Sequence, residues 1–155
     1  MDEQQRKAQL KKTFDTVAEG YGTTGMEFFH HAAAHLPRIF KLKGHEHVLD
    51  VATGTGIAAT AIAPHLPRGK VTGIDLSEGM LAQARARAQS QALDNIELHP
   101  MDMQNIGFDN AHFDAANCSF GLFFLPDMQS LLQHIASKVK SGGQVVACSF
   151  YQGSF

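Results

Sequence analysis

The stretch LDVATGTGIAA, residues 49–59, constrains the fold more than any other part of the chain. An apolar run of strand-like composition reaches Asp50, and Gly54 and Gly56 follow shortly after it. With Ala59 in the last place, these residues fit the pattern G-x-G-x-x-G/A, in which the backbone turns sharply and approaches a ligand before a helix begins. The segment therefore predicts the strand, turn and helix that open a βαβ unit.

Short apolar runs alternate with helical patterns along the rest of the chain. The five predicted strands are residues 47–51, 70–75, 95–99, 112–118 and 144–150. Parallel neighbours need long crossover connections, and helices fill most of the intervals between these strands. We therefore expect an α/β fold in which a doubly wound parallel sheet carries helices on both faces.

Two helices are predicted before the first strand. The first has apolar residues at helical spacing, namely Leu10, Phe14, Val17 and Tyr21. The second covers about residues 26–36. Together they form an N-terminal helical cap.

Three later helices each follow a strand. One leaves the glycine turn and runs to Ile62, and the next is capped by Ser77 and runs to about Leu93. The last follows Asp127 and has an apolar stripe as far as Val139. Basic residues and a glycine pair mark its predicted end: Lys138, Lys140, Gly142 and Gly143.

Length and composition limit the domain organisation and the function classes. A chain of 155 residues predicts one domain over residues 1–155, with the helical cap at 1–40 and the α/β core at 45–150. The formal net charge is −2 and the basic residues are scattered, so no nucleic-acid partner is expected. The basic residues near the start predict only a solvated helix face: Arg6, Lys7, Lys11 and Lys12.

The sequence also suggests a compartment. No apolar run approaches the roughly 20 residues that span a bilayer, and the polar first residues do not resemble a signal peptide. Cys118 and Cys148 lie in predicted strands, where a free cysteine behaves as a small apolar residue. We expect a cytoplasmic protein without a membrane span, since free thiols suit a reducing compartment.

Three carboxylates stand at the ends of three successive predicted strands: Asp50, Asp75 and Asp102. In an open parallel sheet these ends border the ligand site. A carboxylate beside a pyrophosphate costs about 1 kcal/mol in water and several times more at an effective dielectric near 20. S-adenosylmethionine, which carries an ammonium and a sulfonium, fits such a site better than NAD. An NAD-dependent oxidoreductase and a cofactor-binding domain without turnover stay open as alternatives.

Histidines and phenylalanines supply further candidates. His31 and His35 lie one helical turn apart, but no third ligand or zinc motif accompanies them, so no metal site is expected. A general-base role for His30 or His31 stays open. Aromatic residues after the fourth strand could pack in the core or line an apolar substrate pocket: Phe120, Phe123 and Phe124.

Five motifs in order resemble those of class I S-adenosylmethionine-dependent methyltransferases. They are VLDVATGTG, GIDLSEGML, MDMQNIGFDNAHFD, SFGLFFLPD and KVKSGGQVVACSF. FDTVAEGYG adds a likeness to the ubiquinone and menaquinone biosynthesis branch and its generic small-molecule relatives. The resemblance covers about residues 10–150. It implies a Rossmann-like sheet of strand order 3-2-1-4-5 and methyl transfer to a small apolar or aromatic acceptor, with S-adenosylhomocysteine as product.

The resemblance also implies a role for each site residue. Tyr21 and the turn at 50–56 would meet the methionine end of the cofactor, and Asp75 the ribose. Leu76 and Met80 would contact the face of the adenine, and Asp102 and Met103 would contact its edge. Asn117 and Ser119 would lie beside the sulfonium. The predicted cofactor-binding set is therefore Tyr21, Asp50, Ala52, Thr53, Gly54, Thr55, Gly56, Asp75, Leu76, Met80, Asp102, Met103, Asn117 and Ser119. No catalytic residue or metal ligand is assigned.

Members of this family ordinarily continue after the fifth strand into a helix and an antiparallel pair of strands. We expect residues 1–155 to lack that hairpin and to be shortened at the C-terminus. The fifth strand would then form an edge of the sheet, and unpaired edge groups invite pairing with another chain. A homodimer through this edge is the expected consequence.

Overall fold

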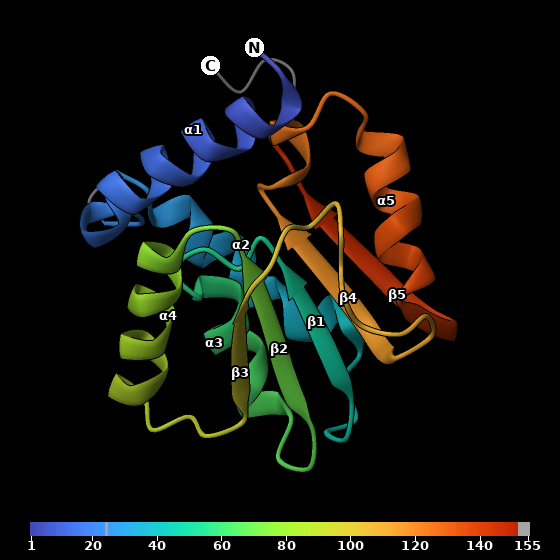
Figure 1. The fold of residues 1–155 in the computed structure, drawn as a ribbon. Coiled ribbons are helices and arrows are strands. Elements are labelled where there is room, and N and C mark those ends of the chain that lie inside the picture. The colour runs from blue at the N-terminus through green and yellow to red at the C-terminus, as the bar shows by residue number, and fades with distance from the viewer. Residues whose placement is uncertain (24, 152–155) are drawn as a thin grey trace.

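The computed structural model describes residues 1–23 and 25–151 and contains one five-stranded sheet in the order β3-β2-β1-β4-β5 (Figure 1). All neighbouring strands are parallel. The strands are β1 (His47–Val51), β2 (Lys70–Asp75), β3 (Ile96–Pro100), β4 (Phe113–Ser119) and β5 (Val139–Cys148). The predicted fold class and strand order are confirmed, and the bounds of β1 and β2 agree with the prediction.

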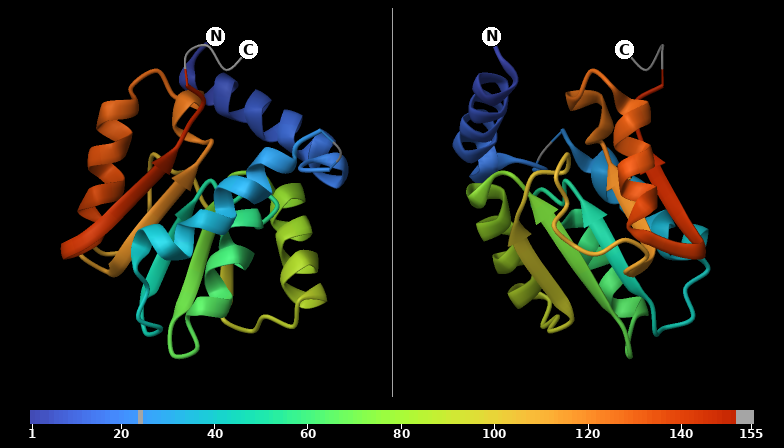
Figure 2. Two further views of the ribbon diagram at one scale, coloured as in Figure 1. Left: turned by 180° about the vertical axis from the view of Figure 1, so that it is seen from behind. Right: turned by 45° about the vertical axis from the view of Figure 1, so that its right-hand side comes forward.

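Helices cover both faces of the sheet (Figure 2). The α-helices are α1 (Glu3–Val17), α2 (Glu27–Phe40), α3 (Ile57–Ile62), α4 (Glu78–Ser90) and α5 (Met128–Ser137). Short 3₁₀ helices are η1 (Ala18–Gly20), η2 (Ala63–His65) and η3 (Leu122–Phe124). Helices α2 and α3 pack together on one face and α5 covers the other, while α1 crosses the top of the sheet (Figure 1).

The two faces of the sheet each have a hydrophobic core. Val48 of β1 packs with Leu36 and Ile62 on the face of α2 and α3. Its neighbour Leu49 packs with Ile135 of α5 on the opposite face. Because adjacent side chains of a strand point to opposite faces, a strand buried on both sides needs a nearly continuous apolar run. This requirement explains why β1 was recognisable from sequence.

The boundary between α5 and β5 differs from the prediction. Helix α5 ends at Ser137, and Val139 begins β5 opposite Phe113, instead of extending the helical stripe. The glycine pair therefore lies within β5, beside an irregularity in its register with β4. A Cβ at Gly143 would lie 2.5 Å from the Asp114 carbonyl oxygen, so the close approach of the two strands requires glycine.

The first two helices also differ from the expected pattern. Tyr21 follows η1 and lies outside α1, and no residue of α1 is buried. An Asp2–Gln5 capping box, rather than a packed apolar face, opens α1. Helix α2 continues past Pro37 to Phe40, which is buried in the core.

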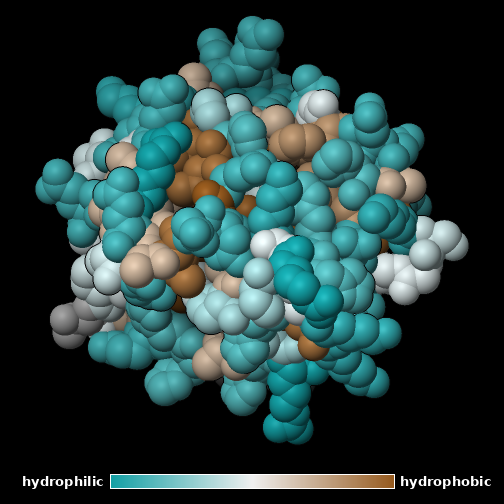
Figure 3. All heavy atoms as spheres, turned by 90° about the horizontal axis from the view of Figure 1, so that it is seen from below, coloured by the Kyte–Doolittle hydropathy of each residue, from teal (hydrophilic) through white to brown (hydrophobic). Residues whose placement is uncertain are grey.

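The surface at the amino ends of the strands, opposite to the end that α1 crosses, is mostly hydrophilic (Figure 3). Seen from the side of the amino ends of the strands, hydrophilic residues cover most of the surface, with small apolar areas between them (Figure 3). None of the helices in the described part of the chain is both long and apolar enough to cross a bilayer.

Candidate cofactor site

A cavity lies at the carboxyl ends of the strands, where the strand order reverses between β1 and β4. All the predicted site residues line it except Gly56 and Asn117. Asn117 is fully buried behind it, and a Cβ at Gly56 would lie 3.0 Å from the Cβ of Ala84, so this glycine allows α3 and α4 to pack closely. The structure therefore brings the predicted residues together at one edge of the sheet.

Asp50 lies beneath the turn and is only 1% exposed. Its carboxylate accepts hydrogen bonds from Thr53 Oγ1 at 2.6 Å and from Asn117 Nδ2 at 2.7 Å. Burial raises the pKa of Asp50 to about 6, against these two hydrogen bonds, which lower it. Both hydrogen-bond donors are uncharged, so the ionised carboxylate projects a negative field into the cavity.

Two of the non-glycine residues with a positive φ lie at the same strand ends. Ala52 has φ 53°, a left-handed conformation that favours glycine, and it is followed by Gly54 at φ 56° and Gly56 at φ 81°. Phe120, just beyond β4, also has a positive φ of 57°. Strained residues of this kind cluster at ligand sites, where the surrounding structure holds them.

Asp75 fixes the turn from the end of β2. Its carboxylate accepts from the Gly54 amide at 2.8 Å and from the Ser77 amide at 2.9 Å. Burial raises the pKa of Asp75, and these backbone N–H groups oppose the shift. The side chain thus links the glycine turn to the start of α4 while it lines the cavity.

Thr55 provides an unsatisfied polar atom in the cavity wall. The residue is only 4% exposed, and its hydroxyl has no hydrogen-bond partner within the described residues. Buried hydroxyl groups are normally paired, because an unpaired one costs about 1–3 kcal/mol. The Thr55 hydroxyl is therefore an energetic cost in the ligand-free protein.

Helix α1 closes the top of the cavity with one face. The residues of this face follow helical spacing: Lys7, Leu10, Lys11 and Phe14. Lys7 Nζ lies 2.6 Å from Asp102 Oδ2 and 2.9 Å from Glu3 Oε1. The expectation that the basic cluster is merely solvated was therefore wrong for Lys7, because α1 lies across the sheet and not beside it.

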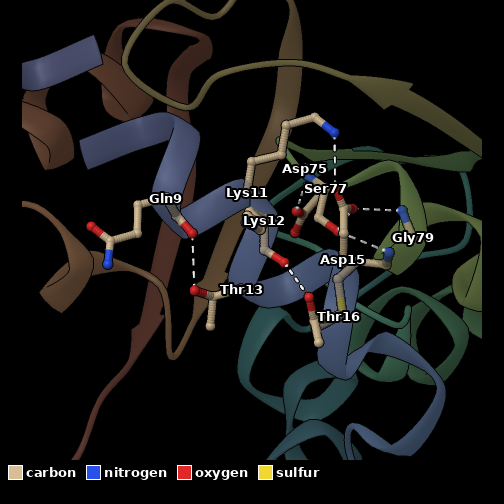
Figure 4. A network of polar contacts seen from close by, with 10 residues as sticks. Gln9, Lys11, Lys12, Thr13, Asp15, Thr16, Asp75, Ser77 and Gly79 are labelled. Atoms are coloured by element: carbon tan, nitrogen blue, oxygen red, sulfur yellow. Dashed lines mark hydrogen bonds and ion pairs between the residues drawn. The ribbon is translucent and has the colours of Figure 1, made fainter. Parts of the chain in front are cut away.

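The other end of α1 is held at the start of α4 (Figure 4). The Asp15 carboxylate accepts from Ser77 Oγ at 2.5 Å, from the Gly79 amide at 3.0 Å and from Lys11 Nζ at 2.9 Å. These contacts, the Ser77 hydroxyl first, lower the pKa of Asp15 to about 2. Polar contacts at both ends therefore hold a helix that buries no side chain.

Aromatic rings form the side of the cavity toward α2 and η3. Tyr21 stacks on Phe29 with ring centroids 5.6 Å apart, and Phe29 meets Phe120 edge-on at 4.9 Å. Phe14 of α1 contacts Phe124 edge-on at 5.2 Å. Of the aromatic run after β4, Phe120 and Phe124 line the cavity, whereas Phe123 is 40% exposed.

Comparison with known proteins identifies the family. The model of the methyltransferase domain family matches residues 48–143, which include the glycine turn, β1 to β4 and α5. The chain belongs to this methyltransferase domain family. The prediction of a class I methyltransferase domain with S-adenosylmethionine as cofactor is thereby confirmed at the level of the family.

Named relatives agree with this assignment. The methyltransferase domain is 33% identical to aklanonic acid methyltransferase DauC from a Streptomyces species, over 100% of this chain and 72% of that protein. It is 29% identical to demethylmenaquinone methyltransferase from Bacillus cytotoxicus, over 93% of this chain and 63% of that protein. A crystal structure of a provisionally assigned methyltransferase from Bacillus halodurans is 34% identical, with TM-score 0.68, covering 74% of this chain and 49% of that one.

Histidines lie away from the cavity of this methyltransferase domain. His30, His31 and His35 are exposed on α2, and none of them lines the cavity. Among the described residues, no group of three or more His, Cys, Asp or Glu side chains could hold a metal ion.

Sequence reasoning missed the contribution of α1 to the site. Leu10 and Phe14 were placed on an apolar helix face. Lys7 and Lys11, which line the cavity from that same face, were not predicted to belong to the site. The signal was available in the spacing, since Lys7, Leu10, Lys11 and Phe14 share one helix face. What the sequence lacked was the position of α1 over the strand ends.

Proposed function

We propose that this methyltransferase domain transfers the methyl group of S-adenosylmethionine to a small apolar or aromatic molecule. The observation that carries the proposal is the buried Asp50 carboxylate beneath the glycine turn, paired with uncharged donors alone. A cation bound above the turn would gain from this field, and an anion would be repelled. S-adenosylmethionine bears such a cation, whereas the diphosphate of NAD brings negative charge to the same place.

The residues around the turn suit the cofactor in other ways. The unpartnered Thr55 hydroxyl offers a hydrogen bond to its amino-acid end, and Asp75 lies where the ribose hydroxyls would reach it. Asp102 Oδ1 accepts from the Gln104 amide and Oδ2 from Lys7. The adenine amine would therefore share Asp102 with Lys7 of the closing helix.

The chain needs little acid–base machinery for this reaction. When bound, S-adenosylmethionine supplies a methyl group already activated by its sulfonium. The protein's contribution is to align the acceptor and exclude water, and the wall formed by Phe29, Phe120 and Phe124 suits an apolar or planar acceptor. Among the described residues no histidine lines the cavity, so the cavity offers the acceptor no imidazole as a base.

The named relatives support an organic acceptor of low molecular mass. One is named for aklanonic acid and another for demethylmenaquinone. The chain spans 72% and 63% of the lengths of these two proteins, so activity and acceptor are proposals for this chain.

Titration calorimetry with S-adenosylmethionine, S-adenosylhomocysteine and NAD tests the cofactor assignment. We expect the two sulfur compounds to bind and NAD to show no binding. Asp50→Asn keeps the shape of the side chain and removes its charge, so it should weaken the binding of S-adenosylmethionine at least about tenfold. Asp94→Asn, at an exposed position far from the turn, is the matched control. Tight NAD binding, or an Asp50 variant with unchanged affinity, would refute the assignment.

Methyl transfer itself tests the acceptor class. With radiolabelled S-adenosylmethionine, we expect label in planar aromatic acids, phenols or quinols and none in sugars or free amino acids. Labelling confined to sugars and free amino acids would leave the cofactor assignment intact and contradict the proposed acceptor.

A further inference from the structure

The segment between β3 and β4, residues 101–112, carries Asp102 and Met103 at the cavity but contains neither a helix nor a strand. It runs beside α5 in front of the sheet (Figure 1). Ile106 anchors it in the core at 3% exposure. A segment without its own backbone ladder depends on contacts from neighbouring elements to keep one conformation.

His134 of α5 and Lys138, the residue that caps the C-terminus of this helix, supply those contacts. His134 Nε2 accepts a hydrogen bond from the Ile106 amide at 3.1 Å. Lys138 Nζ donates to the Phe108 carbonyl oxygen at 2.8 Å and to Asn110 Oδ1 at 3.1 Å. Residues four apart share a helix face, so both side chains meet the segment from the same side.

The contact of His134 requires a neutral ring. A ring nitrogen accepts a hydrogen bond only when it carries no proton, so the proton of the neutral ring must be on Nδ1. Burial, and then the charge of Lys138, lower the pKa of His134, while Asp102 raises it. The ring is therefore neutral at pH 7 and gains a second proton only below the ordinary range of a histidine.

We propose that His134 is a positioning residue for the cofactor, which holds the adenine-binding segment through the Ile106 amide and releases it when the ring is protonated. A protonated Nε2 would point a donor at an N–H donor and leave the Ile106 amide unpaired in the core. Asp102 and Met103 would then lose their fixed place beside the adenine. The inference rests on the proposed function, because it takes S-adenosylmethionine as the ligand.

Other charged groups lie around His134, and one buried carboxylate of the site also gains a proton in acid. Lys138, which caps α5, and Asp102 on the segment face His134, and Lys7 of α1 pairs with Asp102. Asp50, with its pKa of about 6, also becomes protonated as the pH falls and would weaken cation binding by itself. A pH profile of the wild type alone therefore does not identify His134, and variants must be compared.

Titration calorimetry of S-adenosylmethionine with the wild type, His134→Gln and His134→Leu, at about pH 7.5 and at an acid pH where NMR shows the His134 ring protonated, tests the inference. The glutamine amide oxygen can accept from the Ile106 amide at either pH, so His134→Gln should bind normally at the higher pH. Between the two pH values the wild type should lose about fivefold more affinity than this variant. His134→Leu should bind about fivefold more weakly than His134→Gln at both pH values.

Controls separate positioning from folding. Gln133→Leu changes an exposed residue of the same helix and should match the wild type. Amide exchange at Ile106 should be slow in the wild type and in His134→Gln and fast in His134→Leu. Equal affinities for His134→Leu and the wild type at about pH 7.5, or an acid response of His134→Gln equal to that of the wild type, would overturn the inference. Failure of the wild type to bind S-adenosylmethionine would overturn the proposed function itself.

Discussion

At the scale of single residues, the site is built from positions that depart from the ordinary preferences of a folded chain. Asp50 is a buried carboxylate with uncharged partners, and Thr55 is a buried hydroxyl with none in the described chain. Ala52 and Phe120 have positive φ values at the ends of the two central strands. Each departure costs free energy in the ligand-free protein, and departures of this kind are common at ligand sites.

The backbone of Ala52 leads to a prediction about stability. Because φ 53° places its Cβ against the following carbonyl, Ala52→Gly should raise the free energy of unfolding by about 0.5–1 kcal/mol. Urea denaturation measures the change. Ala82→Gly, at an exposed position within α4, should instead lower stability by about 1 kcal/mol. Loss of stability in both variants would show that the strain at Ala52 is not significant.

At the scale of elements, α1 differs from the other helices because it covers a cavity and not a core. It is attached through Lys7 to Asp102, through Asp15 to the start of α4, and through Arg6, whose guanidinium donates to the Phe124 carbonyl oxygen. Exposed ion pairs contribute about 0–1 kcal/mol each, so such a helix can open locally without unfolding the sheet. Local opening of α1 would uncover the cavity that this helix lines.

The attachment at Asp15 can be tested by its removal. Asp15→Ala should speed amide exchange in α1 about fivefold, which corresponds to about 1 kcal/mol after allowance for solvent screening, and leave the β-strands protected. In the wild type this contribution is present above the unfolded pKa near 3.9 and is lost as the pH falls toward the folded pKa of about 2. Asp94→Ala is the control, and equal exchange in both variants would argue against a role for Asp15.

At the scale of the whole molecule, the sheet has one long open edge. Among the strands that the structure describes, none pairs with the outer side of β5, which runs from Val139 to Cys148. Open edges of this length tend to pair with another chain unless something covers them. The same edge lies close to the aromatic wall, since Phe150 contacts Phe28 and Phe120.

Self-association of residues 1–155 through this edge is the corresponding prediction. Light scattering over a range of concentrations should show a dimer. Ala147→Lys places a charge at an exposed position of β5 and should shift the equilibrium toward monomer. Gln89→Lys, on the exposed side of α4, makes a similar change away from the edge. A monomer at high concentration, or equal effects of both variants, would contradict the prediction.

The sequence by itself determined the features that depend on neighbours along the chain. Apolar runs buried on both faces marked β1 and β2, and Gly54 and Gly56 marked the turn, because strand burial and positive φ are local requirements. The carboxylates Asp50 and Asp75 could be placed at the site because parallel strands end at one edge of a sheet.

Only the tertiary structure decided which groups from distant segments meet. In the structure the Asn117 amide donates to Asp50, and Lys7 forms an ion pair with Asp102. The Ile106 amide donates to His134. Strand β5 also begins at Val139 in the structure, because pairing of this residue with β4 outweighs the helical pattern of the sequence there. Spacing along the chain contains no record of such contacts, since they arise when packing of the cores fixes where α1 and α5 lie relative to the sheet.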